Sequence, residues 1–278
     1  MILPQFYVDE VILRALKEDI NYVDVASDYL IPEAQENTAY FVSKADGVLC
    51  GVDVAMRVFE LLDKDFKATL FKKDGDVLKK GDLIAEFTGK TTLLLKGERT
   101  ALNLLQHMSG IATATSEAVA LVAGTKAQIT DTRKTLPSLR ALQKYAVTCG
   151  GGKNHRFNLS DGAMLKDNHI DAAGGITNAV KILREKLGHM VKIEVETRDL
   201  KEVQEAVDAG ADIIMLDNMR YDTMKEAVSI IKDKAKTEAS GGITLENVAE
   251  VAKCGVDIIS LGALTHSVKA FDISMKMK

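Results

Sequence analysis

Seven basic side chains stand close together in the sequence, in three groups separated by glycines and apolar residues. They are Arg133, Lys134, Lys153, His155, Arg156, Lys166 and His169. The whole chain carries a formal net charge of -4, so this basic cluster requires a local explanation. Guanidinium and ammonium groups bind carboxylates and phosphates, and Arg does so through a planar two-point fork. We therefore expect a small polyanionic ligand, although scattered surface charges would explain any one group alone.

Acidic residues follow further along the chain, at the ends of predicted strands. Glu194 and Glu196 are two residues apart on one predicted strand, so their side chains share a face, and Asp217 ends the next strand. Carboxylates bind divalent cations through oxygen, and they also accept hydrogen bonds from sugar hydroxyls. The alternative is that these acids only neutralise Arg156 and Lys166. Glu196 and Asp217 are stronger candidates for a functional role than Glu194.

Glycine-rich segments follow the last two predicted strands. Ser240, Gly241 and Gly242 precede a predicted helix over 243–254, and Gly262 begins the segment GALTHS. Free backbone N–H groups near a helix N-terminus bind phosphate. In α/β barrels, the loops after the last strands are a frequent phosphate site. These segments therefore predict a phosphate site, with simple helix capping as the alternative.

Several common sites are excluded. The sequence has no GxxxxGK(S/T) motif, no GxGxxG after a predicted strand and no HExxH. Its three cysteines, Cys50, Cys149 and Cys254, form no CxxC pair, which excludes a zinc knuckle and a disulfide framework. We interpret Cys149 as a packed thiol. Because disulfides belong to oxidising compartments, this cysteine pattern favours a cytoplasmic protein.

Composition limits the class of protein further. The chain has 278 residues, 46% of them hydrophobic and 27% charged, as in an ordinary globular protein. A sequence pI near 5.8 argues against nucleic-acid binding, which requires a basic domain. No apolar stretch approaches the roughly 18 residues that span a membrane, and the N-terminus does not resemble a signal peptide. A basic pocket in an acidic protein fits a small anionic substrate.

The elements that position these residues fall into two parts. Residues 1–110 predict a small antiparallel α/β sandwich, and the tail 267–278 can pack with it. We expect helices over 9–19 and 51–63, and short strands over 38–43, 68–71, 83–88 and 91–95. A long helical pattern then runs from Gly97 to about Ala123.

Residues 111–266 alternate between short strands and helices, which predicts βαβ units and a parallel sheet. The expected strands are 128–131, 163–166, 191–196, 212–216, 237–239 and 257–260, and the expected helices are 138–147, 176–187, 200–209, 223–234 and 245–254. An open doubly wound sheet and an α/β barrel are both possible. Because nearly every strand ends in a polar residue, as at a barrel active site, we favour the barrel.

The longest of these motifs resemble one known family. The family is that of quinolinate phosphoribosyltransferase, also called carboxylating nicotinate-nucleotide pyrophosphorylase. The matching segments are GERTALNLLQHMSGIAT, DTRKTLPSLRALQKYAVTCGGGKNHRFNLSDGAMLKDNH, EVE, LDN, SGGIT and GALTHS. Their order and spacing match from about Glu18 to Ser274, although the family often has Gly-x-Gly-Asp where this chain has Asn21–Asp24.

The resemblance implies an α/β fold, with an N-terminal α/β sandwich and an incomplete, seven-stranded α/β barrel. It implies a pentosyltransferase that joins quinolinate to phosphoribosyl pyrophosphate (PRPP) with Mg²⁺. The products are nicotinate mononucleotide, pyrophosphate and CO₂, in de novo NAD biosynthesis. It also implies a homodimer in which Arg99 reaches the neighbouring subunit's site.

Roles for individual residues are implied in the same way. The residues implied for quinolinate are Arg99, Thr132, Arg133, Lys134, His155, Arg156 and Lys166. Those implied for PRPP are Glu196, Asp217, Ser240, Gly241, Gly242, Leu261, Gly262 and Ala263. Lys166, Glu196 and Asp217 are the implied catalytic residues, and Glu196 and Asp217 serve Mg²⁺, mostly through PRPP and water.

Two alternatives remain open. A related group of phosphoribosyltransferases, associated with molybdenum transport, keeps DTRKT and the triple glycine, but NHR at 154–156 favours the quinolinate enzyme. The second alternative is a non-catalytic protein that binds a phosphorylated metabolite. Glu196 and Asp217 argue against it, because a protein that only binds anions gains nothing from them.

Overall fold

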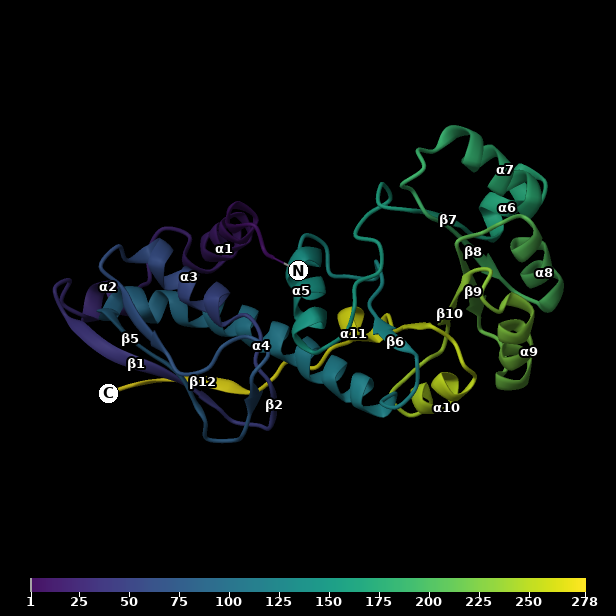
Figure 1. The fold of residues 1–278 in the computed structure, drawn as a ribbon. Helices are drawn as coiled ribbons and strands as arrows, with labels where there is room; N and C mark the ends of the chain where they lie inside the picture. Colours follow the sequence, from purple (N-terminus) through teal and green to yellow (C-terminus); the bar gives the residue numbers. More distant parts are fainter. Residues whose placement is uncertain (1) are drawn as a thin grey trace. The chain divides into compact units, whose positions relative to one another are not determined.

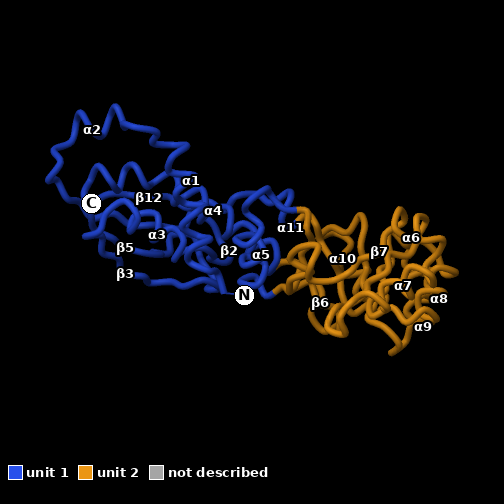
Figure 2. Tube along the Cα trace, turned by 90° about the horizontal axis from the view of Figure 1, so that it is seen from above, with its two compact units in different colours: residues 1–116, 135–151, 264–278 blue, residues 117–134, 152–263 orange. Residues whose placement is uncertain are grey.

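The chain divides into two compact units in a computed structural model that describes residues 2–278. The first unit comprises residues 2–116, 135–151 and 264–278, and the second comprises residues 117–134 and 152–263 (Figure 2). The long helix α4 (Thr91–Leu121) belongs to both. No helix between residues 2 and 278 combines the length and hydropathy required to cross a membrane.

The first unit is built on an antiparallel sheet in the order β12-β1-β5-β3 (Figure 1). Its strands are β1 (Glu36–Ser43), β3 (Lys67–Leu70), β5 (Leu83–Lys90) and β12 (Ile273–Met277), and β2 (Gly47–Val48) pairs separately with β4 (Val77–Leu78). Its other helices are α1 (Gln5–Ile20), α2 (Ser27–Leu30), α3 (Val52–Leu62) and α5 (Arg140–Cys149). Buried Phe41, Phe59 and Phe87 form the centre of its core, with ring centroids 4.9 Å apart for Phe59 and Phe87. The expected antiparallel α/β part of the fold is confirmed.

One expectation in this unit is wrong, because residues 91–95 form the first turns of α4 and no strand. The sequence placed the start of the helix at Gly97. Gly97 lies inside the helix, and a Cβ there would be 2.8 Å from the ring of Phe59. Gly97 therefore permits close packing of α4 against α3 and does not mark the start of the helix. Burial of Leu94 within the core outweighs the β preference of the two threonines before it.

The second unit contains a parallel six-stranded sheet in the order β6-β11-β10-β9-β8-β7. Its strands are β6 (Gln128–Thr130), β7 (Ala163–Leu165), β8 (Ile193–Thr197), β9 (Ile213–Asp217), β10 (Lys236–Ser240) and β11 (Ile258–Ser260). Beside β6, a parallel bridge between Thr130 and Lys153 stands in the place of a seventh strand. The strand order confirms the incomplete α/β barrel, which is not closed between this bridge and β7.

Helices follow the strands, and Figure 1 shows α8 and α9 beside β8 and β9. They are α6 (Asp167–Ala173), α7 (Ile176–Lys186), α8 (Leu200–Asp208), α9 (Tyr221–Ile231) and α10 (Val248–Lys253), and after β11 the short helix α11 (Ala263–His266) returns the chain to the first unit. The α8 helix begins where Asp199 accepts hydrogen bonds from the N–H groups of Lys201 and Glu202. α10 begins later than expected, because Asn247 closes a turn by donating to Gly242 O and accepting from Thr244 N–H.

Candidate active site

A cavity of about 610 Å³ opens where the parallel strands of the second unit end. Arg133 and Lys166 follow β6 and β7, Glu196 lies near the end of β8, and Asp217 and Ser240 end β9 and β10. Of the residues expected at the site, Thr132, Arg133, Lys134, His155, Arg156, Lys166, Glu196, Asp217, Ser240, Gly241 and Gly242 line this cavity. Its volume is that of a small-molecule site. Residues spread over more than one hundred positions of sequence therefore meet in one pocket.

Arg133 and Arg156 bring two positive charges to the same side of the pocket. Burial and the neighbouring charge of Arg133 both lower the pKa of Arg156. The Nη1 group of Arg156 donates to the carbonyl of Gly162 at 2.8 Å, which fixes the direction of its guanidinium. Two like charges held together are stabilised by an anion placed between them. This pair is therefore the strongest anion-binding feature of the pocket.

Lys166 and Glu196 form an ion pair across the pocket, with 2.6 Å between Nζ and Oε2. Lys166 caps α6, and its backbone N–H donates to His169 Nδ1 at 3.1 Å. The capping interaction holds Lys166 at the exit of β7, and Glu196 extends from the adjacent strand β8. The neutralising contact considered from the sequence is thus present between these two residues.

Asp131 fixes the segment that carries His155 and Arg156. The Asp131 side chain is fully buried, and its Oδ1 accepts the backbone N–H of His155 at 2.9 Å. Its Oδ2 accepts Nδ2 of Asn154 at 2.6 Å. Asp131 is the last residue of the strand expected over 128–131, but its positioning role depends on a contact between two segments that no local pattern indicates.

His155 lines the cavity and lies between two buried carboxylates. Its Nε2 is 3.2 Å from Glu194 Oε2 and 3.4 Å from Glu238 Oε1. Burial opposes protonation, but hydrogen bonds to Glu194 and Glu238 raise the pKa of His155 to about 10. Burial raises the pKa of Glu194 as well. In the neutral ring the backbone N–H of Arg156 donates to Nδ1 at 2.7 Å and the ring proton lies on Nε2, and protonation of Nδ1 to give the charged ring breaks this contact.

Glu238 was not identified as a site residue from the sequence. It occupies the middle of β10 and is 1% exposed. The sequence did contain one signal, a glutamate inside a five-residue strand and next to small residues. Charged residues are rarely buried without a partner, so a buried glutamate at this position predicts one. The partner, His155, is remote in the sequence and becomes evident only in the fold.

The glycine end of the pocket is shaped by Asn218. Gly241 and Gly242 have φ values of +90° and +60°. A Cβ on Gly241 would lie 2.3 Å from Asn218 Oδ1, and the Asn218 N–H donates to Ser240 O at 2.9 Å. Because α10 begins only at Val248, the glycines belong to a turn and not to the first helical turn. Their backbone N–H groups remain suited to a phosphate.

Four expected residues are not among those that line the cavity. Leu261, Gly262 and Ala263 follow β11, whose last residue Ser260 does line it. Arg99 is exposed on α4, in the first unit. The structure thus gathers most of the site and leaves Arg99 on a separate exposed surface.

Family models match nearly the whole chain. The model "Quinolinate phosphoribosyl transferase, N-terminal domain" matches residues 24–109, and "Quinolinate phosphoribosyl transferase, C-terminal domain" matches residues 111–276. A Bacillus subtilis protein named "Probable nicotinate-nucleotide pyrophosphorylase (carboxylating)" is 50% identical over 258 residues, which cover 93% of this chain and 89% of that protein. An Arabidopsis thaliana protein named "Nicotinate-nucleotide pyrophosphorylase (carboxylating), chloroplastic" is 44% identical over 99% of this chain and 84% of its own length.

Solved structures agree with this match. The crystal structure of NadC from Streptococcus pyogenes superposes with a TM-score of 0.97 at 40% identity, covering 100% of this chain and 99% of that one. A structure of the nicotinate-nucleotide pyrophosphorylase from Francisella tularensis gives a TM-score of 0.96 at 39% identity, covering 100% and 98% of the two chains.

Proposed function

The chain belongs to the quinolinate phosphoribosyl transferase family, and from this premise we propose how its residues divide the reaction. The enzyme is a pentosyltransferase that joins quinolinate to PRPP and releases CO₂ and pyrophosphate, leaving nicotinate mononucleotide. One observation carries the assignment of residues: cations, acids and glycines line a single cavity at the strand ends. A dicarboxylate and a phosphorylated sugar require these three kinds of group side by side.

Quinolinate carries two carboxylates on adjacent ring carbons, and the basic side of the pocket suits them. We assign them to Arg133, Arg156 and Lys166, with Lys134, His155 and Thr132 completing the wall. Binding one carboxylate relieves the repulsion between the two guanidiniums. Fixed charges also orient the ring nitrogen toward the sugar, and such positioning contributes several kcal/mol to catalysis.

The other side of the pocket suits PRPP. We assign the ribose hydroxyls to Glu196 and Asp217, and the 5′-phosphate to the turn at Ser240–Gly242. The ring nitrogen forms a bond to C1 of the ribose while the bond from C1 to the pyrophosphate oxygen breaks. Carboxylates near C1 stabilise the positive charge that develops there.

Decarboxylation then needs little from the protein. The ring nitrogen is cationic after transfer, so the electron pair left at C2 by departing CO₂ lies next to a positive charge. One proton must reach C2, and we propose the ammonium group of Lys166 as its source. Lys166 is exposed at the pocket and its partner Glu196 is 15% exposed, so the proton can be replaced from solvent.

Mg²⁺ is the cofactor that we propose. Two groups of three metal-ligating side chains lie close together within residues 2–278, and neither includes Glu196 or Asp217. Both carboxylates line the cavity, but Glu196 bonds to Lys166 and Asp217 to Asn218. Such donors fit a cation held mostly by substrate oxygens and water, as Mg²⁺ usually is. When bound, the ion neutralises the charge on departing pyrophosphate.

A homodimer is part of the proposal. Phe6, Tyr22, Val25, Tyr29 and Leu30 are each more than two-thirds exposed, an unusual concentration of apolar side chains within thirty residues. A second copy of the chain would bury them, and the exposed Arg99 would serve a neighbouring subunit's quinolinate site. Location in the cytoplasm stays a prediction.

A single assay tests the function. Purified protein is mixed with Mg²⁺, quinolinate and PRPP, and nicotinate mononucleotide and CO₂ are measured. We expect both products in equal amounts, and none of either when quinolinate is omitted. Binding without product would favour the non-catalytic alternative. Product from nicotinic acid but not from quinolinate would assign the pocket to a different phosphoribosyltransferase.

A further inference from the structure

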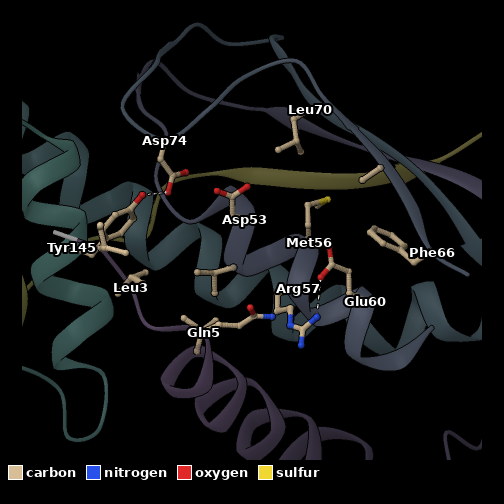
Figure 3. A pocket seen from close by; sticks show the side chains of 14 residues that line it. Leu3, Gln5, Asp53, Met56, Arg57, Glu60, Phe66, Leu70, Asp74 and Tyr145 are labelled. Atoms are coloured by element: carbon tan, nitrogen blue, oxygen red, sulfur yellow. Dashed lines mark hydrogen bonds and ion pairs between the residues drawn. The ribbon is translucent and has the colours of Figure 1, made fainter. Parts of the chain in front are cut away.

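A second cluster of reactive side chains lies in the first unit and takes no part in the transfer reaction. The thiols of Cys50 and Cys149 and a carboxylate oxygen of Asp74 all lie within 4.8 Å of one another. Tyr145 donates its hydroxyl to Asp74 Oδ2 at 2.9 Å (Figure 3). Neither thiol has a role in the transfer reaction, so the placement of both beside a carboxylate and a phenol requires a separate explanation.

Backbone contacts fix the two segments that carry the cysteines. Cys50 precedes α3, and its N–H and C=O are both bonded to the Ser109 hydroxyl, at 3.0 and 3.1 Å. Gly75 donates to the carbonyl of Leu49 at 2.8 Å, and a Cβ on Gly75 would be 3.9 Å from the Cys149 carbonyl oxygen. The same turn therefore contacts the backbone next to Cys50 and that of Cys149 itself. The two sulfurs lie within 4.8 Å of each other, and a disulfide requires them to approach to about 2.05 Å.

The two thiols are chemically unequal. Cys50 is fully buried, and burial raises the pKa of its thiol. Cys149 is partly exposed at the end of α5, and the hydrogen bond from Cys50 lowers the pKa of Cys149. A pocket of about 630 Å³ reaches Asp74 and Tyr145 and brings solvent to the edge of the cluster (Figure 3). Since the thiolate is the attacking form, Cys149 is the nucleophile and Cys50 the second thiol.

We propose that Cys50 and Cys149 are a reversible modification site, which forms a disulfide by exchange with a low-molecular-weight disulfide such as oxidised glutathione. Cys149 sulfur attacks one sulfur of that disulfide and releases the first small thiol. Cys50 then gives its proton to Asp74, whose Oδ2 is 4.0 Å from Cys50 Sγ. Cys50 sulfur attacks Cys149 sulfur and releases the second small thiol. Two protein thiols are oxidised, and one small disulfide is reduced to two thiols.

Asp74 is suited to this proton transfer and unsuited to a resident metal. Burial raises the pKa of Asp74, which makes its carboxylate a better base than an exposed one. Its Oδ1 accepts the N–H groups of Gly51 and Val52, at 2.8 and 3.0 Å. With Oδ2 bonded to Tyr145, a metal would have to displace a hydrogen bond of the carboxylate. The cluster is therefore assigned to thiol exchange.

Mass spectrometry tests the proposal. The full-length protein is equilibrated with reduced and oxidised glutathione, alkylated, and measured intact and as peptides. We expect the chain to lose two hydrogens, a cross-linked peptide pair containing Cys50 and Cys149, and full reversal by dithiothreitol. The Cys254→Ser variant is the matched control, because Cys254 is buried at the end of α10 and is not part of the cluster, and it should behave like the wild type.

Variants separate the two steps. Cys50→Ser should accumulate a glutathione adduct on Cys149, and Cys50→Ala repeats the test if the serine variant does not fold. Asp74→Asn should slow closure of the disulfide, so that the same adduct persists several times longer than in the wild type. A lasting adduct on wild-type Cys149, a cross-link involving Cys254, unmodified thiols throughout, or a zinc ion that co-purifies and shields both thiols would each overturn the proposal.

Discussion

The ammonium group of Lys166 lies 2.6 Å from a carboxylate oxygen of Glu196. This ion pair joins the residue that we assign to quinolinate with the residue that we assign to the ribose of PRPP. On this assignment we expect a substrate carboxylate and Glu196 to compete for one ammonium group. Quinolinate bound at Lys166 would then release Glu196 toward the sugar, which would link the two substrate subsites.

Replacing Lys166 with alanine removes the link and one quinolinate contact together. A charge-assisted hydrogen bond contributes about 1.5–3 kcal/mol, so we expect kcat/KM for quinolinate to fall by about 100-fold. Lys166→Arg should recover part of this loss, because the charge remains. Lys153→Ala is the matched control, since Lys153 is exposed in the same region and does not line the cavity. Equal rates for Lys166→Ala and Lys153→Ala would contradict the assignment.

Arg133→Ala and Arg156→Ala should each abolish quinolinate turnover and leave the fold intact. Arg→Lys at either position should also lower kcat/KM, because the two-point fork is lost. Circular dichroism and steady-state rates are compared with Arg184→Ala, which removes only surface contacts, chiefly a pair with Asp212. Near-normal turnover in both alanine variants would refute the pocket.

Gly241→Ala should weaken PRPP binding. The new Cβ would collide with the Asn218 side chain at 2.3 Å, and the residue must hold φ at +90°. Such strain costs about 1–3 kcal/mol, so KM for PRPP should rise roughly tenfold while KM for quinolinate changes little. Gly188→Ala is the control, because a Cβ on Gly188 would meet nothing within 4 Å and its φ is not positive. If the turn had only a structural role, Gly241→Ala would lower the free energy of unfolding and leave the ratio of the two KM values unchanged, which would contradict the assignment.

The sequence was sufficient for the order of strands and helices and for most of the pocket. Strand ends in a βαβ pattern converge on one edge, so Arg133, Lys166, Glu196 and Asp217 could be placed together from the sequence alone. The predicted ends of helices and strands were wrong where tertiary packing outweighs the local conformational preference of the residues. Gly97 looks like a helix start and is instead a site of close helix packing against Phe59.

Contacts between segments that are far apart in the chain could not be predicted from the sequence. His155 was expected in the pocket wall, but the two carboxylates on either side of it come from β8 and β10. Likewise, Cys149 was interpreted as a packed thiol, because its neighbours Cys50 and Asp74 are distant in the chain. The pattern and spacing of residues describe one segment of the chain at a time. These clusters form only when different segments pack against one another in the folded protein.

His155 gives the protein a pH-dependent stability whose sign can be stated. Its folded pKa of about 10 lies above the unfolded value near 6.5, so the native state binds more protons between these two values. The stabilisation is fully present below about pH 6.5 and is lost as pH rises toward 10, by at most about 1.4 kcal/mol per pH unit. Glu194, whose pKa burial raises, acts in the same direction.

Urea unfolding at pH 6, 8 and 10 should show this decline in the wild type and a flatter curve in His155→Asn, with exposed His189→Asn as the control. Parallel curves for wild type and His155→Asn would show that the carboxylates do not hold this proton.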